Sequence, residues 1–215
     1  MLTIVHGMRR QVVSHVMLTI DLPSARIRSL SVGPFDNIVY IVSCKATGKA
    51  AIVDAANEAD RVLAAADDVD PLVVLTTHGH GDHLGAVGEV TAALGIPFRL
   101  HEADRVIANR SIDEPLLPGP ITVGEISIGA IHTPGHTPGS MCFVIDGVVL
   151  TGDTLFPGGP GATRFPYSDF DQIMNSLHAQ LFSRPDETRI LPGHGAPTMI
   201  GTERPHLAEW TARHW

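Results

Sequence analysis

Four side chains that can bind a metal ion stand close together in the segment TTHGHGDHLG, residues 76–85. They follow an apolar run, PLVVL, which is typical of a buried strand, and they are His78, His80, Asp82 and His83. Imidazole nitrogens and carboxylate oxygens at the carboxyl end of a strand are typical of a metal site in an α/β fold. The alternative is a solvated turn, because the glycines of the segment are what a loop would use.

Three further positions repeat this setting, each with a metal-binding residue type just after an apolar strand and surrounded by Gly and Pro. They are His136 in TPGHTPGS, Asp153 in LTGDTLF and His194 in ILPGHGAP. Any one of them alone fits a turn residue or a backbone-capping side chain. Together with the first cluster they supply five imidazoles and two carboxylates. A catalytic zinc-type centre needs about three protein donors and a water, so the set is large enough for two neighbouring ions that share a carboxylate.

The spacing within the first cluster also favours convergence on one point. His78 and His80 are two residues apart, so in an extended segment both rings project to the same side. We expect Asp82 and His83 to begin the following helix and to bend back toward that point, where the helix amino end favours Asp82 as an anion. Donors of this kind suit Zn, Fe, Mn or Ni, and no thiolate ligand is present in the motifs to narrow the choice.

The elements that must position these residues alternate between strands and helices in the first half of the chain. Runs rich in β-branched residues predict strands, and apolar residues at helical spacing predict helices. The expected strands of this half are 27–33, 37–43, 50–55, 71–77 and 97–100, and the expected helices are 58–66 and 84–94. The second half is expected to hold strands at 121–133, 141–145, 148–152 and 188–194, with helices at 169–182 and 202–212.

This pattern predicts a single α/β domain with helices outside the sheets. We place the domain at residues 17–215. Residues 1–16 are expected to be an uncertain N-terminal extension, because Met8 and Met17 leave the start codon open.

The composition of the chain limits the classes of partner. A length of 215 residues and an apolar content of 44% are enough for a substantial core. The net charge of −8, with no basic stripe, argues against a nucleic acid partner. Two cysteines make no disulfide framework, and no apolar run approaches the roughly 20 residues of a membrane span. We expect a cytoplasmic monomer or homodimer that takes a small-molecule substrate and binds neither nucleic acid nor membrane.

The run H-x-H-x-D-H at 78–83 and the TPGHT, GDTLF and PGHG contexts that follow resemble the metallo-β-lactamase superfamily, and within it the compact branch of glyoxalase II-like hydrolases. The resemblance extends from about Ser29 to the C-terminus. It implies an α/β fold of the metallo-β-lactamase type, a four-layer αβ/βα sandwich with a dinuclear metal site between the two sheet edges.

The same resemblance, carried over position by position, implies a role for each donor. A first metal would be held by His78, His80 and His136, a second by Asp82, His83 and His194, and Asp153 would bridge them. The resemblance also implies that Asp54, which ends the run AAIVD, supports the site without binding metal. Taken alone, Asp54 also fits a strand-end turn.

Two such ions would lower the pKa of a shared water and polarise a carbonyl oxygen. The implied activity is therefore hydrolysis of a thioester, hydroxyacylglutathione-like, or of a related ester by a metal-bridging hydroxide, with zinc as the expected metal. Asp82 is expected to orient that hydroxide and to help move its proton. No GxSxG elbow is present and both cysteines lie in apolar runs, so no serine or cysteine triad competes with this mechanism.

Other activities of similar proteins stay open. A persulfide dioxygenase would hold a single iron on His78, His136 and Asp153, which leaves four of the seven donors without a role. Lactone hydrolysis is a further alternative. RNA processing fits poorly with the −8 charge, and a non-catalytic metal-binding protein would not need a full ligand set.

Substrate contacts are expected from loops. Only 21 residues follow His194, so the added C-terminal helical domain that helps glyoxalase II enzymes bind glutathione is expected to be missing. The segment FPGGPGATRFPYSDF offers Arg164 as a contact for an anion and Tyr167 or Phe165 as an apolar wall, with Phe35 across the site. The alternative is a surface loop with a salt-bridged arginine and half-buried aromatic side chains.

Overall fold

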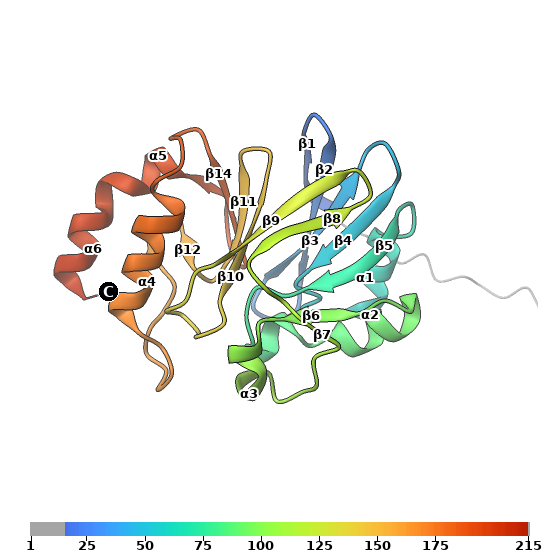
Figure 1. Cartoon of the computed structure of the whole chain (residues 1–215), viewed down its shortest axis with the longest axis horizontal. Helices are drawn as coiled ribbons and strands as arrows, with labels where there is room; N and C mark the ends of the chain where they lie inside the picture. Colours follow the sequence, from blue (N-terminus) through green and yellow to red (C-terminus); the bar gives the residue numbers. More distant parts are fainter. Residues whose placement is uncertain (1–15, 215) are drawn as a thin grey trace, which may run out of the picture.

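Two β-sheets lie face to face in the computed structural model, which describes residues 16–214, and helices flank them on both outer sides (Figure 1). The first sheet runs in sequence order through β1 (Val16–Asp21), β2 (Ala25–Val32), β3 (Asn37–Cys44), β4 (Lys49–Val53), β5 (Asp70–Leu75), β6 (Phe98–Leu100) and β7 (Glu114–Pro115). The second has the spatial order β15 (Thr198–Met199), β14 (Arg189–Pro192), β11 (Val148–Gly152), β10 (Met141–Ile145), β9 (Ile126–His132) and β8 (Gly119–Val123). A small hairpin joins β12 (Leu155–Phe156) to β13 (Gly159–Pro160).

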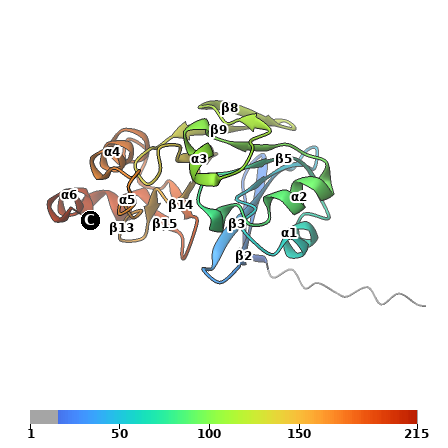
Figure 2. The same cartoon turned by 90° about the horizontal axis from the view of Figure 1, so that it is seen from below.

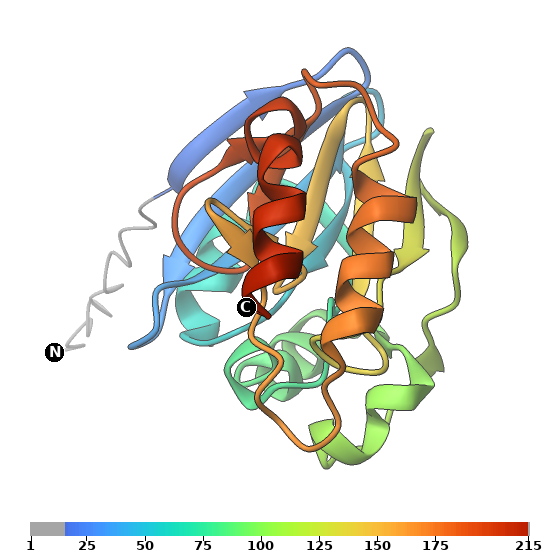
Figure 3. The same cartoon turned by 90° about the vertical axis from the view of Figure 1, so that its left-hand side faces the viewer.

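Helices cover the outer face of each sheet. The first sheet carries α1 (Ala59–Ala65) and α2 (Val87–Leu94), which lie side by side in Figure 2, and the short α3 (Arg105–Ala108) follows further along the chain. The second sheet carries α4 (Phe170–Ser176), which continues as a turn of π-helix at Leu177–Leu181, and the C-terminal helices α5 (Ile200–Glu203) and α6 (Leu207–Arg213). Figure 3 shows the orange α4 and the red α6 side by side in front of this sheet.

The layers follow from the alternation of side chains along the strands. All eight residues of β3 are buried, because its two faces are covered by different layers. Val42 points between the sheets, where it belongs to one apolar cluster with Phe143 and Leu150 of the second sheet. Its neighbour Ile41 points the other way and packs with Val62 and the other apolar residues beneath α1 and α2.

A third apolar cluster lies on the far side of the second sheet. Cys142 and Val149 of that sheet pack there against Ile173 of α4 and Trp210 of α6. Three apolar interfaces separate four layers, so the predicted αβ/βα sandwich is confirmed.

Two pairs of parallel strands bring the carboxyl ends of both sheets to a common edge. Strands β4 and β5 are parallel in the first sheet, and β11 and β14 are parallel in the second. Backbone hydrogen bonds then join the two sheets at this edge. The Met141 N–H donates to the Thr77 carbonyl at 2.7 Å, and the Ile38 N–H donates to the Gly193 carbonyl at 2.7 Å. The loops after these strands therefore face one another.

The element boundaries differ from the sequence-based expectation in a few places. The predicted strand 121–133 is two strands, β8 and β9, with a turn at Gly124. The predicted helix 202–212 is α5 and α6 joined by a 3-10 turn at Arg204–His206. Strand β1 was not predicted. The expected extension 1–16 lies outside the described residues except for Val16, which begins β1.

Two further expectations concern the cysteines and the membrane. Cys44 and Cys142 are both free and buried. None of the helices within residues 16–214 is long and apolar enough to cross a membrane.

We predict that Phe143→Ala lowers the free energy of unfolding by about 3–5 kcal/mol, because it removes a fully buried ring between the two sheets and leaves a cavity. Chemical denaturation followed by circular dichroism measures the loss. Val106→Ala is the control: its side chain is 89% exposed, so a change within about 0.5 kcal/mol is expected. Equal effects of the two substitutions would contradict the packing described here.

Candidate metal centre

The predicted donors all lie at the shared edge of the two sheets, each in a loop that follows the carboxyl end of a strand. Segment 78–83 follows β5, and Asp54 follows β4 beside it. His136 follows β9, Asp153 follows β11 and His194 follows β14. The structure therefore brings together residues that are more than a hundred positions apart in the chain.

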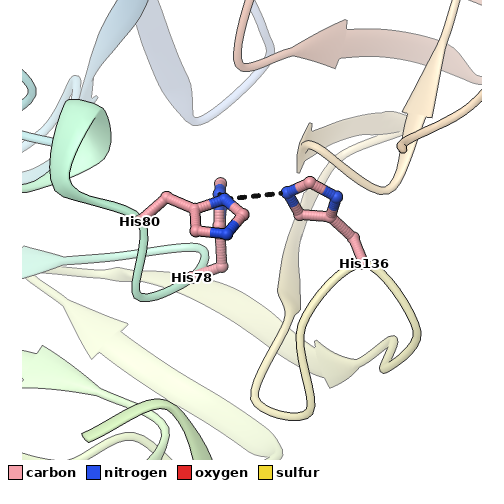
Figure 4. A group of neighbouring side chains, drawn as sticks. All are labelled: His78, His80 and His136. Atoms are coloured by element: carbon pink, nitrogen blue, oxygen red, sulfur yellow. Dashed lines mark hydrogen bonds between the residues drawn. The ribbon is translucent and has the colours of Figure 1, made fainter. Parts of the chain in front are cut away.

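Three imidazoles from two loops form the first group of donors (Figure 4). His80 Nδ1 lies 3.0 Å from His78 Nε2 and 3.0 Å from His136 Nε2. Around a tetrahedral zinc with Zn–N bonds of about 2.0–2.1 Å, neighbouring nitrogens are about 3.3 Å apart. The three nitrogens thus have nearly the spacing that one bound ion requires.

The second group of donors lies beside the first and consists of Asp82, His83 and His194. The Nε2 atoms of His83 and His194 are 3.2 Å apart. Asp82 Oδ2 is 3.3 Å from His194 Nε2 and 3.7 Å from His83 Nε2. This group also has the spacing of ligands around one ion.

Asp153 stands between the two groups. Its Oδ1 is 3.4 Å from His83 Nε2 in the second group, and its Oδ2 is 3.6 Å from His136 Nε2 in the first. Within the described part of the chain, Oδ1 is buried and has no hydrogen-bond partner. A buried carboxylate oxygen without a donor is costly unless a cation compensates it, so Asp153 has the placement of a bridging ligand.

The local structure of Asp82 and His83 corrects one sequence-based expectation. These residues do not begin the following helix, because Gly81–His83 is a separate 3-10 turn and α2 starts only at Val87. The turn still brings both side chains together with His194 in one group of donors. The amino end of α2, however, is not at Asp82, so the helix dipole is not what favours its anionic form.

Asp54 holds two of the imidazoles from outside the donor groups. Its Oδ2 accepts a hydrogen bond from His83 Nδ1 at 2.9 Å and another from the Thr77 hydroxyl at 2.8 Å. Because the Thr77 hydroxyl proton points to Asp54, its oxygen accepts from His78 Nδ1 at 3.1 Å. Both rings therefore carry their proton on Nδ1 and turn the Nε2 lone pair inward.

The other three imidazoles also hydrogen-bond an oxygen on their outer side. The pairs are His136 Nδ1 with the Ala162 carbonyl at 2.7 Å, His194 Nδ1 with the Phe35 carbonyl at 2.8 Å, and His80 Nε2 with the Tyr167 hydroxyl at 2.8 Å. With the outer nitrogens protonated, lone pairs only about 3 Å apart face one another, which is unfavourable without a cation between them. The residues present therefore fit a pair of divalent ions.

The segment 162–168 supports the first group from one side. It supplies the Ala162 carbonyl to His136 and the Tyr167 hydroxyl to His80. The Ser168 hydroxyl donates to the His136 backbone carbonyl at 2.7 Å. Two of the three imidazoles of the first group are thus oriented by one loop.

Burial and neighbouring charges set the pKa values at the site. Burial lowers the pKa of His80 to about 4, and the neighbouring His136 adds to the shift. Burial also holds the pKa of His78 well below its usual value, with His83 next in importance. Burial alone would lower the pKa of His83, but the Asp153 and Asp54 carboxylates outweigh it and raise that pKa well above its usual value. The carboxylates therefore favour positive charge here, as a bound cation would supply.

A glycine makes the approach of the last loop possible. A Cβ atom on Gly193 would lie 2.6 Å from His83 Cε1 and 2.7 Å from Asp153 Oδ1. No larger residue fits without displacing these two donors. The first glycine of the PGHG motif therefore allows this loop to pack closely against the other donor loops.

Asn37 and Asp104 are among the residues that contact the site but were not found from the sequence. Asn37 is 2% exposed, and its amide Nδ2 donates to Asp82 Oδ2 at 3.0 Å. Asp104 is fully buried and accepts hydrogen bonds from both loops that carry the first group. Neither position has a local signal, because Asn37 begins an ordinary strand and the string HEADR around Asp104 resembles a first helical turn.

A cavity of about 570 Å³ opens over both groups of donors. Among its lining residues are Phe35, Phe156, Arg164 and Phe165. The Arg164 guanidinium lies 5.5 Å from the centre of the Phe165 ring and makes no ion pair with a described carboxylate. Tyr167 does not line the cavity: its ring stacks on Phe165, and its hydroxyl contacts His80.

Comparison with known proteins gives one consistent family. The sequence profile of the metallo-β-lactamase superfamily matches residues 32–194. Hydroxyacylglutathione hydrolase GloC of Haemophilus influenzae is 32% identical over 186 residues, covering 72% of this chain and 84% of that protein. The probable metallo-hydrolase YqgX of Bacillus subtilis is 31% identical over 200 residues, covering 82% of this chain and 93% of that protein.

Solved structures agree with this result. The BLEG-1 B3 metallo-β-lactamase superposes with a TM-score of 0.77 at 28% identity, covering 86% of this chain and 99% of its own. TTHA1623, solved in a di-iron-bound form, superposes with a TM-score of 0.74 at 31% identity, covering 82% and 96%. The profile spans all seven donors. The chain therefore belongs to the metallo-β-lactamase superfamily, as its four ordered motifs predicted.

Proposed function

We propose that this protein is a dinuclear-metal-dependent hydrolase that cleaves a hydroxyacylglutathione-like thioester or a related ester. The observation that carries the proposal is the pair of donor groups that share Asp153 beneath an open cavity. The relatives named hydroxyacylglutathione hydrolase support the thioester over other substrates of metal-dependent hydrolases. Neither cysteine competes as a nucleophile, since Cys44 and Cys142 are both buried.

The chain supplies the ligands and holds them in place. In the proposal, His78, His80 and His136 hold one ion, Asp82, His83 and His194 hold the other, and Asp153 contacts both. When bound, two divalent ions would supply an acidified water and polarise the substrate carbonyl. The Asp54, Asp82 and Asp153 carboxylates offset most of the charge that such ions bring. Zinc is the proposed metal, since it binds imidazole and carboxylate donors. The same set of donors also suits Fe, Mn and Ni.

Asp82 is the proposed acid–base residue. It lines the cavity, and the Asn37 amide fixes the direction of its carboxylate through the 3.0 Å hydrogen bond to Oδ2. Burial would raise the pKa of Asp82, but the His194 hydrogen bond and the nearby His83 hold it well below its usual value. The carboxylate is therefore in the form that orients a water and accepts its proton.

The cavity wall supports an anionic, partly apolar substrate. Phe35 is 67% exposed on one side, and Phe165 lies on the other with Arg164 over its ring. A guanidinium without a carboxylate partner is suited to a substrate carboxylate, which a glutathione thioester carries. We therefore propose Arg164 and Phe35 as substrate contacts, whereas Tyr167, which does not line the cavity, would act through its bond to His80.

We predict that the metal-loaded protein contains two ions per chain and that His194→Ala lowers this to one, because only the second group of donors loses a ligand. Elemental analysis after exhaustive dialysis measures the ratio. The control is His178→Ala, which removes an exposed imidazole on the outer helix layer and is expected to leave two ions. A single iron per chain, together with oxygen uptake on glutathione persulfide, would instead identify a dioxygenase.

We predict that Arg164→Ala raises the KM for a hydroxyacylglutathione thioester about tenfold with little change in kcat, which corresponds to about 1.4 kcal/mol of binding free energy. The KM for a neutral thioester of the same acyl group should not change. Steady-state assays on protein of known metal content measure both constants, with Arg26→Ala as the matched control, because Arg26 is exposed on β2 and does not line the cavity.

The same assay tests the hydrolase assignment itself. Protein stripped by a chelator is expected to lose thioester hydrolysis and to regain it when zinc is added. Undiminished turnover without metal would contradict the assignment. Equal KM increases for charged and neutral thioesters would contradict only the role of Arg164.

A further inference from the structure

The Asp104 carboxylate joins two loops that are far apart in the sequence. Asp104 ends a 3-10 turn, Glu102–Asp104, and its side chain is fully buried. Its Oδ2 accepts hydrogen bonds from the Gly79 N–H at 2.7 Å and from the Thr137 hydroxyl at 2.6 Å. Its Oδ1 accepts from the Gly139 N–H at 2.6 Å. One carboxylate therefore accepts three hydrogen bonds, one from the loop of Gly79 and two from the loop of Thr137 and Gly139.

Both loops belong to the first group of donors. Gly79 stands between His78 and His80, and Thr137 directly follows His136. The two loops approach each other at the site through His80 Nδ1 and His136 Nε2, which are 3.0 Å apart. Asp104 thus hydrogen-bonds the Gly79 backbone between His78 and His80, and the side chain of Thr137 next to His136.

The second group of donors has different supports. His83 is held by Asp54, Asp82 by Asn37, and His194 by the Phe35 carbonyl. None of these contacts involves Asp104. The two groups can therefore be perturbed separately.

Close packing also limits the distance between Asp104 and each of the two loops. A Cβ atom on Gly79 would lie 2.8 Å from the Asp104 carbonyl oxygen, and a Cβ atom on Gly139 would lie 2.6 Å from Asp104 Cγ. The loops can therefore move neither closer to Asp104, because of contact, nor away from it without breaking buried hydrogen bonds.

We propose that Asp104 is a positioning residue that sets the separation of His136 from His78 and His80, and thereby the affinity of the first ion site but not of the second. Metal–ligand bonds tolerate deviations of only about 0.2 Å, so a small shift of one loop weakens binding. Loss of a group that orients ligands typically lowers metal affinity by about 10–100-fold. The proposal requires the two-ion site but no particular substrate.

Titration of metal-free protein with Co²⁺, followed by visible absorption, tests the proposal, because the spectrum depends on the geometry of the ligands. His194→Ala and His136→Ala give reference spectra of the first and the second site alone. For Asp104→Asn, which keeps the size but replaces one acceptor oxygen with a donor, we expect one ion to bind as in the wild type. The other should bind about 10–100-fold more weakly, and the half-loaded spectrum should match that of His136→Ala.

Two further variants keep the outcome decisive. Thr137→Val removes one hydrogen bond to Oδ2 and is expected to give the same selective loss with a smaller magnitude. Glu203→Gln is the matched control, because Glu203 is also a buried carboxylate that accepts from a backbone N–H and a threonine hydroxyl, at Gly158 and Thr198. It should leave both Co²⁺ affinities unchanged. If Asp104→Asn does not fold, the two Co²⁺ affinities of Thr137→Val test the proposal.

Equal weakening of both sites, or no weakening of either, in the Asp104→Asn and Thr137→Val variants would overturn the positioning role. A wild-type protein that binds fewer than two Co²⁺ ions would overturn the two-ion site and this proposal with it. Thioester hydrolysis does not enter the readout, so failure of the proposed substrate leaves the test intact.

Discussion

Five imidazole rings at one edge of the fold must each turn a lone pair inward while the other ring nitrogen keeps its proton. The structure meets this requirement with an oxygen acceptor behind every ring: the Asp54 carboxylate, the Thr77 and Tyr167 hydroxyls, and the backbone carbonyls of Phe35 and Ala162. The inward lone pairs lie too close together to be stable without positive charge between them. Most of what surrounds the site serves to maintain this arrangement.

The sheets supply the rigidity that such an arrangement needs. Donors and their acceptors follow parallel strand pairs that end at the same edge, and the two sheets are joined there by the backbone bonds of Thr77 and Gly193. Behind that edge lies the apolar cluster around Phe143, which fixes the distance between the sheets. Ligands mounted on strand ends over a packed core hold their geometry better than ligands on long free loops.

The sequence was sufficient for the fold, the family and the position of each donor, because these leave local signals. His136, Asp153 and His194 each stand between an apolar run and a Gly- or Pro-rich turn, and that pattern can be recognised one segment at a time. The roles of the donors at a bound metal stay predictions.

Asn37 and Asp104 left no such signal, since each acts on residues at least 25 positions away. The break between the Gly81–His83 turn and α2 was missed for the same reason. A Cβ atom on Gly85 would lie 2.5 Å from the Ala56 carbonyl oxygen, so tertiary packing, not helix propensity, decides the backbone path there.

The loop 162–168 both forms the cavity wall, through Arg164 and Phe165, and holds the outer nitrogens of His80 and His136. The substrate contact proposed for Arg164 and the orientation of two of the imidazoles therefore depend on the same seven residues. Substitutions that reshape this loop to broaden the substrate range would therefore also change the affinity for metal. Diversification should therefore proceed more freely on the opposite wall at the Phe35 side chain, which is mostly exposed and contributes only its backbone to His194.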